Sequence, residues 1–243
     1  MTANLLLDTD HEFELIIAYT FGDTQPTFQG EGPSAGTPAV FIRLSRCNLT
    51  CGYCDTKETW DWANYDIKKE SHKRTVDDLA AWALAQDVDL VVITGGEPLL
   101  QQKKLVPLVQ RLLAGGKRIE FETNGTIAPL PELLIDGVQF NVSPKLANSD
   151  VAEHKRIVPV ALRAFAASGQ AIFKFVTRTV DELDEIASYA EQFGLAPIYV
   201  MPEGTTAEGL VATTRLLADH VPARGWHFTQ RMHIFAFGDK RAR

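Results

Sequence analysis

All the cysteines of this chain lie in one short stretch, CNLTCGYCDTKETWD, at Cys47, Cys51 and Cys54. Three thiolates at a CxxxCxxC spacing can hold three irons of a [4Fe-4S] cluster and leave the fourth iron without a protein ligand. An iron with an open coordination position can bind another molecule. The spacing therefore predicts a cluster that takes part in chemistry.

Two other uses of the cysteines are weaker interpretations. A structural zinc site needs a fourth ligand, and the nearest histidine, His72, lies well outside the loop. A disulfide would leave one cysteine unpaired and, across so short a loop, would gain little from loop closure. We therefore favour the cluster.

Composition is typical of a cytoplasmic enzyme. With 243 residues, 45% of them hydrophobic, the chain is long enough for one sizeable core, and we expect a single domain over residues 1–243. The net charge of -7 argues against a nucleic-acid surface, and we expect the basic side chains near the C-terminus, Lys240, Arg241 and Arg243, to be solvated. Residues 1–10 lack the pattern of a secretory signal, and no apolar stretch is long enough to span a membrane.

Short apolar runs alternate with helical patterns, which predicts parallel βα units. We expect strands at residues 13–19, 39–44, 90–94, 118–122, 138–142, 171–176, 197–201 and 227–235. We expect helices at residues 76–85, 101–114, 180–193 and 206–220, the first capped by Thr75 and the third by Thr179. Because the chain is short for a complete eight-stranded barrel, the predicted fold is α/β, a partial, open (β/α) barrel.

Polar motifs follow five of the expected strands: the cysteine loop, then TGGEP at 94–98, ETNG at 122–125, SPK at 143–145 and MPEG at 201–204. Each motif alone is an ordinary loop sequence. In parallel α/β folds, however, the carboxyl ends of the strands meet at one rim, where ligands bind. Gly95 and Gly96 have no β-carbon and would let the backbone approach a ligand closely. The sequence therefore predicts one site at this rim.

The cysteine motif, with the aromatic Tyr53 just before Cys54, resembles that of the radical S-adenosylmethionine superfamily. The resemblance implies a partial (β/α) barrel in which the open iron binds S-adenosylmethionine and an electron passed to its sulfonium produces a 5'-deoxyadenosyl radical. In that superfamily, TGGEP looks like the segment that meets the methionyl amino end of the cofactor.

A more restrictive resemblance extends over nearly the whole chain. The segments TFQGEGP (27–33), AVFIRL (39–44), CDT (54–56), ETNG and SPK are similar to those of the 7-carboxy-7-deazaguanine synthase family, of the queuosine and 7-deazapurine pathways. The resemblance implies substrate contacts at Phe28, Gln29, Gly30, Arg43 and Thr94. It implies S-adenosylmethionine contacts at Tyr53, Cys54, Asp55, Gly96, Ser143, Pro144, Lys145, Met201, Pro202, Glu203 and Gly204. It implies a magnesium ligand at Thr56 beside the cluster ligands Cys47, Cys51 and Cys54.

Elementary chemistry agrees with several of these roles. The guanidinium of Arg43 can meet a carboxylate in two parallel hydrogen bonds, although a surface ion pair is the alternative. Magnesium prefers hard oxygen ligands and takes few from protein, so the hydroxyl of Thr56 is sufficient if substrate oxygens supply others. Gln29 and Glu31 present edges that could pair with an aminopyrimidinone, although Glu31 could instead hold the loop.

The resemblance implies a lyase that rearranges 6-carboxy-5,6,7,8-tetrahydropterin into 7-carboxy-7-deazaguanine. Hydrogen is taken from C6, the ring contracts, ammonia leaves and S-adenosylmethionine is regenerated. The protein mainly has to orient and shield the substrate, so no catalytic acid or base is assigned. The resemblance also implies a homodimer and an electron donor such as flavodoxin or ferredoxin.

Two other functions have to be weighed. A glycyl-radical-enzyme activating enzyme shares the cysteine motif but lacks the QGEG strip and CDT. An iron-sulfur or zinc module without catalytic activity would leave the rim motifs unexplained. The chain also departs from the family at its end: relatives commonly stop soon after a Gln-x-His segment, whereas here residues 234–243 follow His233. A role for the terminal carboxylate in substrate binding is therefore in doubt, and His233 is either a substrate neighbour or an ordinary strand histidine.

Overall fold

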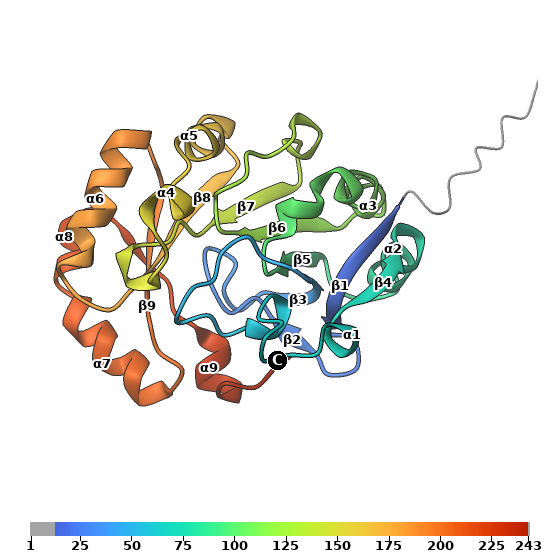
Figure 1. Ribbon diagram of the computed structural model, residues 1–243, viewed down its shortest axis with the longest axis horizontal. Coiled ribbons are helices and arrows are strands. Elements are labelled where there is room, and N and C mark those ends of the chain that lie inside the picture. The colour runs from blue at the N-terminus through green and yellow to red at the C-terminus, as the bar shows by residue number, and fades with distance from the viewer. Residues whose placement is uncertain (1–12, 243) are drawn as a thin grey trace, which may run out of the picture.

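The computed structural model describes residues 13–242, in which the strands form one curved mixed sheet with helices outside it (Figure 1). The order of its strands is β10-β9-β8-β7-β6-β5-β3-β1-β4, with β2 paired to β3. The strands are β1 (Glu14–Phe21), β2 (Thr27–Phe28), β3 (Pro38–Leu44), β4 (His72–Thr75), β5 (Leu90–Gly95), β6 (Arg118–Thr123), β7 (Val138–Val142), β8 (Ala171–Thr177), β9 (Ile198–Pro202) and β10 (His227–Phe228). The absence of a signal in residues 1–10 and the solvation of Arg243 lie outside the described residues.

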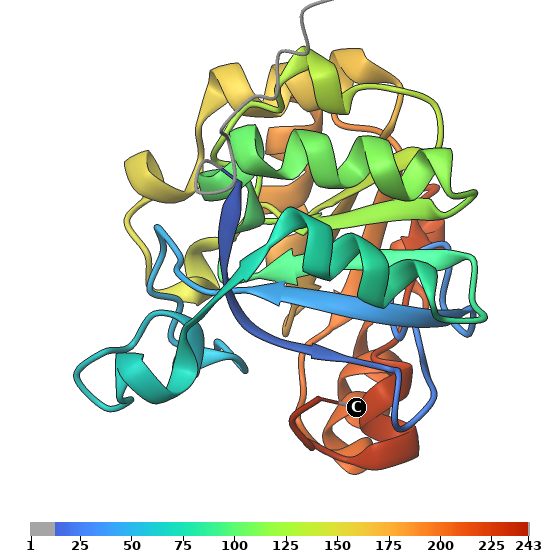
Figure 2. The same cartoon turned by 90° about the vertical axis from the view of Figure 1, so that its right-hand side faces the viewer.

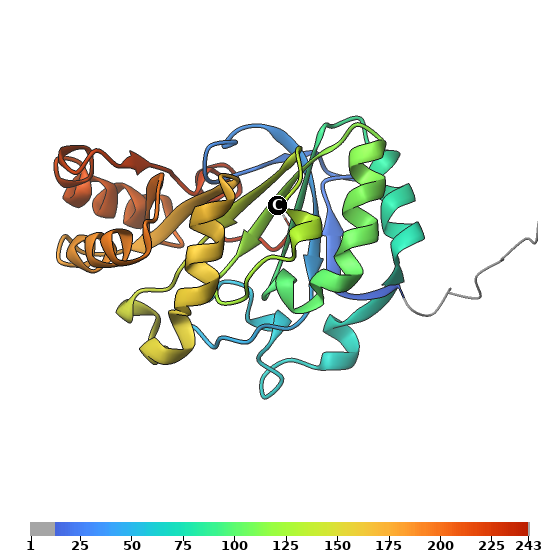
Figure 3. The same ribbon diagram turned by 90° about the horizontal axis from the view of Figure 1, so that it is seen from above.

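The sheet is open, as expected. In the order of the sheet, the strands β3, β5, β6, β7, β8, β9 and β10 each pair in parallel with their neighbour. The two ends of the sheet lie at opposite sides of the molecule (Figure 3). The expected strand at 13–19 exists as β1 but pairs antiparallel with β3 and β4. A parallel pair needs a crossover connection, and no helix lies between β1 and β3.

The helices are α1 (Ile67–Glu70), α2 (Val76–Leu84), α3 (Gln102–Ala114), α4 (Glu153–Arg156), α5 (Pro159–Ser168), α6 (Glu182–Phe193), α7 (Ala207–Leu217), α8 (His220–Ala223) and α9 (Met232–Phe237). Thr75 caps α2 as expected, because its hydroxyl accepts a hydrogen bond from the N–H of Asp78. The expected cap at Thr179 is wrong: α6 begins after Asp181. The carboxylate of Glu182 instead accepts from the N–H groups of Arg178 and Thr179.

The expected strand at 227–235 is mostly wrong. Only β10 is extended there, and Met232–Phe237 forms α9. A short apolar run does not distinguish strand from helix by periodicity alone. The sequence analysis also missed α5, although Pro159 at its first turn and Gly169 in a left-handed conformation after it are ordinary helix boundaries.

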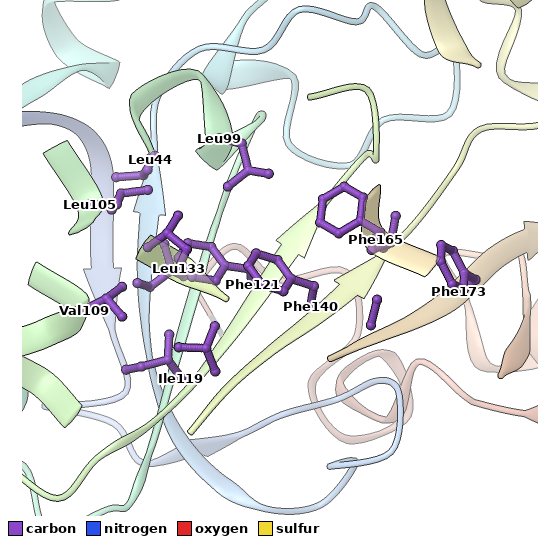
Figure 4. Packing of buried hydrophobic residues seen from close by; sticks show 14 of the residues in the cluster. Leu44, Leu99, Leu105, Val109, Ile119, Phe121, Leu133, Phe140, Phe165 and Phe173 are labelled. Carbon is purple, nitrogen blue, oxygen red and sulfur yellow. The ribbon is translucent and has the colours of Figure 1, made fainter. Parts of the chain in front are cut away.

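The main core lies between the outer face of the sheet and the helices (Figure 4). Strand β6 contributes Ile119 and Phe121, helix α3 contributes Leu105 and Val109, and all four are almost fully buried. Because strand side chains alternate between faces, Glu120 and Glu122, which alternate with Ile119 and Phe121 in β6, point to the inner side of the curved sheet. Within residues 13–242 no helix is long and apolar enough to cross a membrane.

Candidate active site

A cavity of about 460 Å³ lies at the carboxyl ends of the parallel strands. All five rim motifs contribute to it. The predicted residues that line it are Phe28, Gln29, Gly30, Arg43, Cys47, Cys51, Tyr53, Cys54, Asp55, Thr56, Thr94, Gly96, Ser143, Lys145, Met201 and Glu203. Pro144, Pro202 and Gly204 do not line it. The five strand ends therefore meet at one cavity, as expected, and the roles of the individual residues stay predictions.

The cysteine loop follows β3 directly and projects beyond the end of the sheet (Figure 2). None of its cysteines is in a disulfide. Two N–H groups point at sulfur atoms: Trp60 Nε1 lies 3.3 Å from Cys54 Sγ and the Leu49 nitrogen 3.5 Å from Cys47 Sγ. Hydrogen bonds of this kind stabilise and tune metal-bound thiolates. Since all three thiols face one cavity, the residues fit the cluster predicted from their spacing.

The zinc interpretation finds no support in the geometry. A mononuclear zinc ion needs ligand atoms that converge at about 2.0–2.3 Å from one point. No three Cys, His, Asp or Glu side chains converge in that way within the part of the chain that the structure describes. Burial raises the pKa of the Cys47 thiol to about 12, so a metal that binds this sulfur must displace its proton.

The TGGEP motif holds the start of the cysteine loop. The N–H of Gly96 donates to the Leu44 carbonyl at 3.2 Å, and the N–H of Glu97 donates to the Arg46 carbonyl at 2.9 Å. A Cβ on Gly95 would stand 2.7 Å from the oxygen of Leu44. These glycines are therefore required by the close approach of protein backbone, a reason for them that the sequence analysis did not foresee.

The side chain of Glu97 also holds neighbouring backbone in place. Its buried carboxylate accepts hydrogen bonds from the N–H of Leu99 at 2.9 Å, the N–H of Asn124 at 2.7 Å and the hydroxyl of Thr123 at 2.8 Å. It thus ties TGGEP to ETNG. Burial is the main cause of the raised pKa of Glu97, and these hydrogen bonds oppose the increase.

Two cavity-lining residues beside the cysteines, Thr56 and Tyr53, carry hydroxyls with no oxygen or nitrogen partner among the described residues. The hydroxyl of Thr56 does not cap the 3-10 helix η1 (Lys57–Thr59) that follows it, and its hydrogen-bond partner among the described residues is Cys54 Sγ at 3.7 Å. The hydroxyl of Tyr53 is buried without a hydrogen-bond partner. An unpaired buried hydroxyl is costly unless something satisfies it. These atoms fit a magnesium ion and a polar cofactor.

Arg43 points a largely unpaired guanidinium into the cavity. Its Nη1 makes only a long hydrogen bond of 3.4 Å to the Gly95 carbonyl, and its Nε is buried without a partner. The guanidinium lies 5.6 Å from the centroid of the Tyr19 ring. No carboxylate of the described residues pairs with Arg43 within salt-bridge distance, so the alternative of a surface ion pair finds no support there. Its β5 neighbour in register is Thr94, so the two predicted substrate contacts lie side by side.

Gln29 is bound by the protein at both ends of its amide. Its Nε2 donates to Glu122 at 3.0 Å and to Glu120 at 3.2 Å, and its Oε1 accepts from the N–H of Glu31 at 3.3 Å. The side chain is therefore committed to shaping the cavity wall. The expected pairing of this amide with an aminopyrimidinone would require those bonds to be exchanged.

The inner face of the sheet carries a buried charge network that the sequence analysis missed. Lys174 Nζ lies 2.5 Å from Glu31 Oε2 and 2.7 Å from Glu122 Oε2, and the lysine side chain is only 2% exposed. Glu122 Oε1 also accepts from the amide of Asn141 at 2.9 Å. A signal existed: polar residues alternate with apolar ones in IEFET, QFNV and IFKF, which in strands buried on their outer face indicates a polar inner face.

Charges in this network oppose the effect of burial. Burial disfavours the ionised form of Glu31, but the nearby Lys174, His233 and Arg231 outweigh it and hold the pKa of Glu31 well below its usual value. Burial also disfavours the charged form of Lys174 and by itself would lower the pKa of this amine, but Glu122 and Glu31 raise it. At neutral pH Lys174 is a cation held between the carboxyl groups of Glu31 and Glu122, and both of these residues line the cavity.

The segment after β10 returns to the site. The N–H of Met232 donates to the Gly30 carbonyl at 2.9 Å, and a Cβ on Gly30 would overlap the imidazole of His233. His233 lines the cavity, so it is a cavity residue on α9 and not a strand histidine. Lys240 and Arg241 are exposed, as expected, but Arg241 also pairs with Glu58 at 3.5 Å and Glu70 at 2.5 Å. Residues 239–242 thus form part of the cavity wall near Arg43.

With this geometry established, the chain can be compared with known proteins. A model of the radical SAM superfamily matches residues 41–161. The 7-carboxy-7-deazaguanine synthase of Pyrobaculum aerophilum is 36% identical over 221 residues, 89% of this chain and 94% of that relative. The chain belongs to the 7-carboxy-7-deazaguanine synthase family. A second member, from Rhodopirellula baltica, is 35% identical over 95% of this chain and 89% of its own length.

Solved structures agree with this family assignment. The crystal structure of QueE from Escherichia coli has a TM-score of 0.71 and 26% sequence identity, over 96% of this chain and 100% of that one. Streptococcus suis SuiB bound to S-adenosylmethionine has a TM-score of 0.54 over 76% of this chain and 48% of that one, at 14% identity, which shows the shared fold alone. The open barrel predicted from the sequence is thus the fold of this family.

Proposed function

We propose that the chain is a radical S-adenosylmethionine lyase that rearranges 6-carboxy-5,6,7,8-tetrahydropterin into 7-carboxy-7-deazaguanine and releases ammonia, in queuosine and other 7-deazapurine biosynthesis. One observation carries the proposal: a single cavity brings together the three thiols, the hydroxyl of Thr56 and the unpaired guanidinium of Arg43. These groups match a cluster, a magnesium ion and a carboxylated substrate.

Arg43 would bind the substrate carboxylate. A guanidinium is a planar fork that suits two parallel hydrogen bonds, and within the described residues only a long contact of 3.4 Å from Nη1 to the Gly95 carbonyl engages the Nη atoms of Arg43. The Tyr19 and Phe21 rings near its guanidinium hold it in place from one side. Thr94, in register beside it, supports the same end of the substrate.

The carboxylates of Glu31 and Glu122 would receive the other end. An aminopyrimidinone ring presents N–H donors on one edge, and the carboxylate of Glu31, whose pKa is held low by Lys174 and other nearby cations, is a strong acceptor for them, whereas burial raises the pKa of Glu122. Both carboxylates are held by Lys174, whose position on β8 is fixed by the sheet. Gln29 and Gly30 contribute the wall beside them, together with Phe28.

Cys47, Cys51 and Cys54 would hold the cluster, and Thr56 would hold magnesium. Tyr53, Asp55, Gly96, Ser143, Lys145, Met201 and Glu203 line the cavity and would contact S-adenosylmethionine, and the adjoining residues Pro144, Pro202 and Gly204 do not line it. When bound, the cluster and S-adenosylmethionine would supply the electron and the radical needed to remove hydrogen from C6 of the substrate. The chain itself has to orient that carbon and exclude water, and the buried walls of the cavity serve both purposes.

Partners and location follow from the same proposal. A one-electron donor such as flavodoxin or ferredoxin would reduce the cluster, and the family resemblance supports a homodimer. An oxygen-sensitive cluster suits the reducing cytoplasm better than an oxidising compartment. The glycyl-radical activating alternative is not supported by any described feature, since the relatives that span nearly the whole chain are synthases.

Anaerobic reconstitution tests the proposal. The protein should bind about four irons and absorb broadly in the visible range, and each of Cys47→Ala, Cys51→Ala and Cys54→Ala should abolish both properties. With reductant and S-adenosylmethionine, the reconstituted protein should convert the pterin and release ammonia. Stoichiometric zinc in place of iron, or a glycyl radical installed on a partner protein while the pterin stays intact, would overturn it.

A further inference from the structure

Arg231 makes contacts that no role described so far uses. It lies between β10 and α9, and its side chain is only 9% exposed. Nη1 donates to the Gly204 carbonyl at 2.8 Å, Nη2 donates to the carboxylate of Asp55, and Nε lies 3.6 Å from Glu31 Oε1. One guanidinium therefore reaches three segments that are far apart in the sequence.

The three segments belong to two parts of the cavity. Asp55 follows the last cysteine and Gly204 ends the MPEG loop, both on the side assigned to S-adenosylmethionine. Glu31 belongs to the strip assigned to the substrate, and its second oxygen is held by Lys174. A line of alternating charges thus runs from Asp55 through Arg231 and Glu31 to Lys174, from one ligand's side to the other's.

The guanidinium of Arg231 at the centre of this line of charges is rigid, and its rigidity fixes the geometry of the line. A guanidinium is planar and always charged, so its donors hold fixed directions relative to one another. The backbone fixes it further, since the N–H of Met232, the next residue, donates to the Gly30 carbonyl. A shift of the partly exposed Asp55 carboxylate must therefore move the buried guanidinium of Arg231 or break the ion pair between them, and movement of Arg231 alters the position of Glu31.

We propose that Arg231 is a positioning residue that couples the binding of S-adenosylmethionine to the binding of the pterin. The inference rests on the proposed function, because it uses the two ligands assigned there. Each ligand would fix one end of the charge line in its productive position and so prepare the other end. Coupling between two sites is reciprocal, so each ligand should tighten the other by the same factor.

The test is a binding measurement on reconstituted protein without reductant, so that no turnover occurs. S-adenosylmethionine is titrated calorimetrically with and without 6-carboxytetrahydropterin. In the wild type the pterin should lower the Kd of S-adenosylmethionine about fivefold or more. In Arg231→Lys and Arg231→Met this ratio should fall to near one, because a point charge or an apolar chain cannot hold Asp55 and Glu31 together.

Arg224→Met is the matched control. Arg224 also pairs with a carboxylate, Asp184 at 2.6 Å, and lies over an aromatic ring, Trp226, but it does not line the cavity. It should keep the wild-type ratio. Iron content and thermal unfolding identify any variant that fails to fold, and Asp55→Asn then tests the same link from its other end, again with a ratio near one expected.

The outcomes separate the two proposals. A ratio in Arg231→Lys equal to that of the wild type would overturn the coupling role, as would weaker binding of both ligands at an unchanged ratio. A wild-type ratio of one with pterin that binds would also overturn it and leave the function intact. Failure of the wild type to bind pterin at all would instead contradict the proposed function.

Discussion

Gly96 lies against Cys47: a Cβ built on the glycine would stand 2.7 Å from the Cβ of the cysteine and would overlap the carbonyl of Arg46. The strand end that carries TGGEP and the loop that carries the thiols are therefore in direct contact. The arrangement of the three cysteines depends on a residue from a different motif, more than forty positions along the chain.

Gly96→Ala should therefore impair cluster assembly. Backbone must move to admit the methyl group, and such overpacking costs about 1–3 kcal/mol and displaces its neighbours. We expect lower iron content after reconstitution, measured by a colorimetric iron assay, while circular dichroism still shows a folded α/β protein. Gly209→Ala, where the only close contact is Thr206 Oγ1 at 3.2 Å, is the control and should bind iron normally. Equal iron in both variants would mean that the loop tolerates the displacement.

Thr56→Ala should reduce the response to magnesium without removing iron. Among the described residues, the hydroxyl of Thr56 caps no helix and has only the sulfur of Cys54 as a hydrogen-bond partner, and magnesium takes few protein ligands. Activity measured over a range of magnesium concentrations should require more of the ion and reach a lower maximum. Thr24→Ala, at an exposed threonine outside the cavity, should behave as the wild type. An unchanged magnesium response in Thr56→Ala would exclude this ligand.

Stability should depend on pH through His233. Burial is the main reason why the pKa of His233 is lowered from its ordinary value. Below that ordinary value, near 6.5, the unfolded chain binds a proton that the folded chain does not, so stability decreases as the pH falls. Between about pH 7.5 and about pH 5.5 the Tm of the wild type should fall more than that of His233→Gln. Parallel Tm curves would show that the imidazole does not contribute.

Much of this site could be predicted from the sequence because its parts are short motifs at strand ends. The CxxxCxxC motif and the gathering of the strand ends needed only residue types, spacing and the rule that parallel strands present their carboxyl ends together, whereas the roles of Arg43 and Thr56 came from the family resemblance. Arg231 could not be found in that way. It follows a two-residue strand in a segment expected to be extended, and only the fold brings it to Asp55 and Glu31. Lys174 lay within a correctly predicted strand, but its role required the partner carboxylates from other strands.

Arg43→Ala should weaken substrate binding while cofactor binding survives. Loss of a charge-assisted pair costs about 1.5–3 kcal/mol, so the Kd of the pterin should rise on the order of 10- to 100-fold. Arg43→Lys should restore little of the affinity, because an ammonium cannot reproduce the two parallel bonds. Titration of the pterin without reductant measures both effects. Full affinity in Arg43→Lys would mean that charge alone is recognised, and the fork would then have no role.

The most direct test of the central claim follows one hydrogen atom. The pterin labelled with deuterium at C6 is incubated with reconstituted protein, reductant and S-adenosylmethionine, and 5'-deoxyadenosine is analysed by mass spectrometry. We predict deuterium in 5'-deoxyadenosine together with formation of 7-carboxy-7-deazaguanine. Unlabelled 5'-deoxyadenosine beside unchanged pterin would contradict the account.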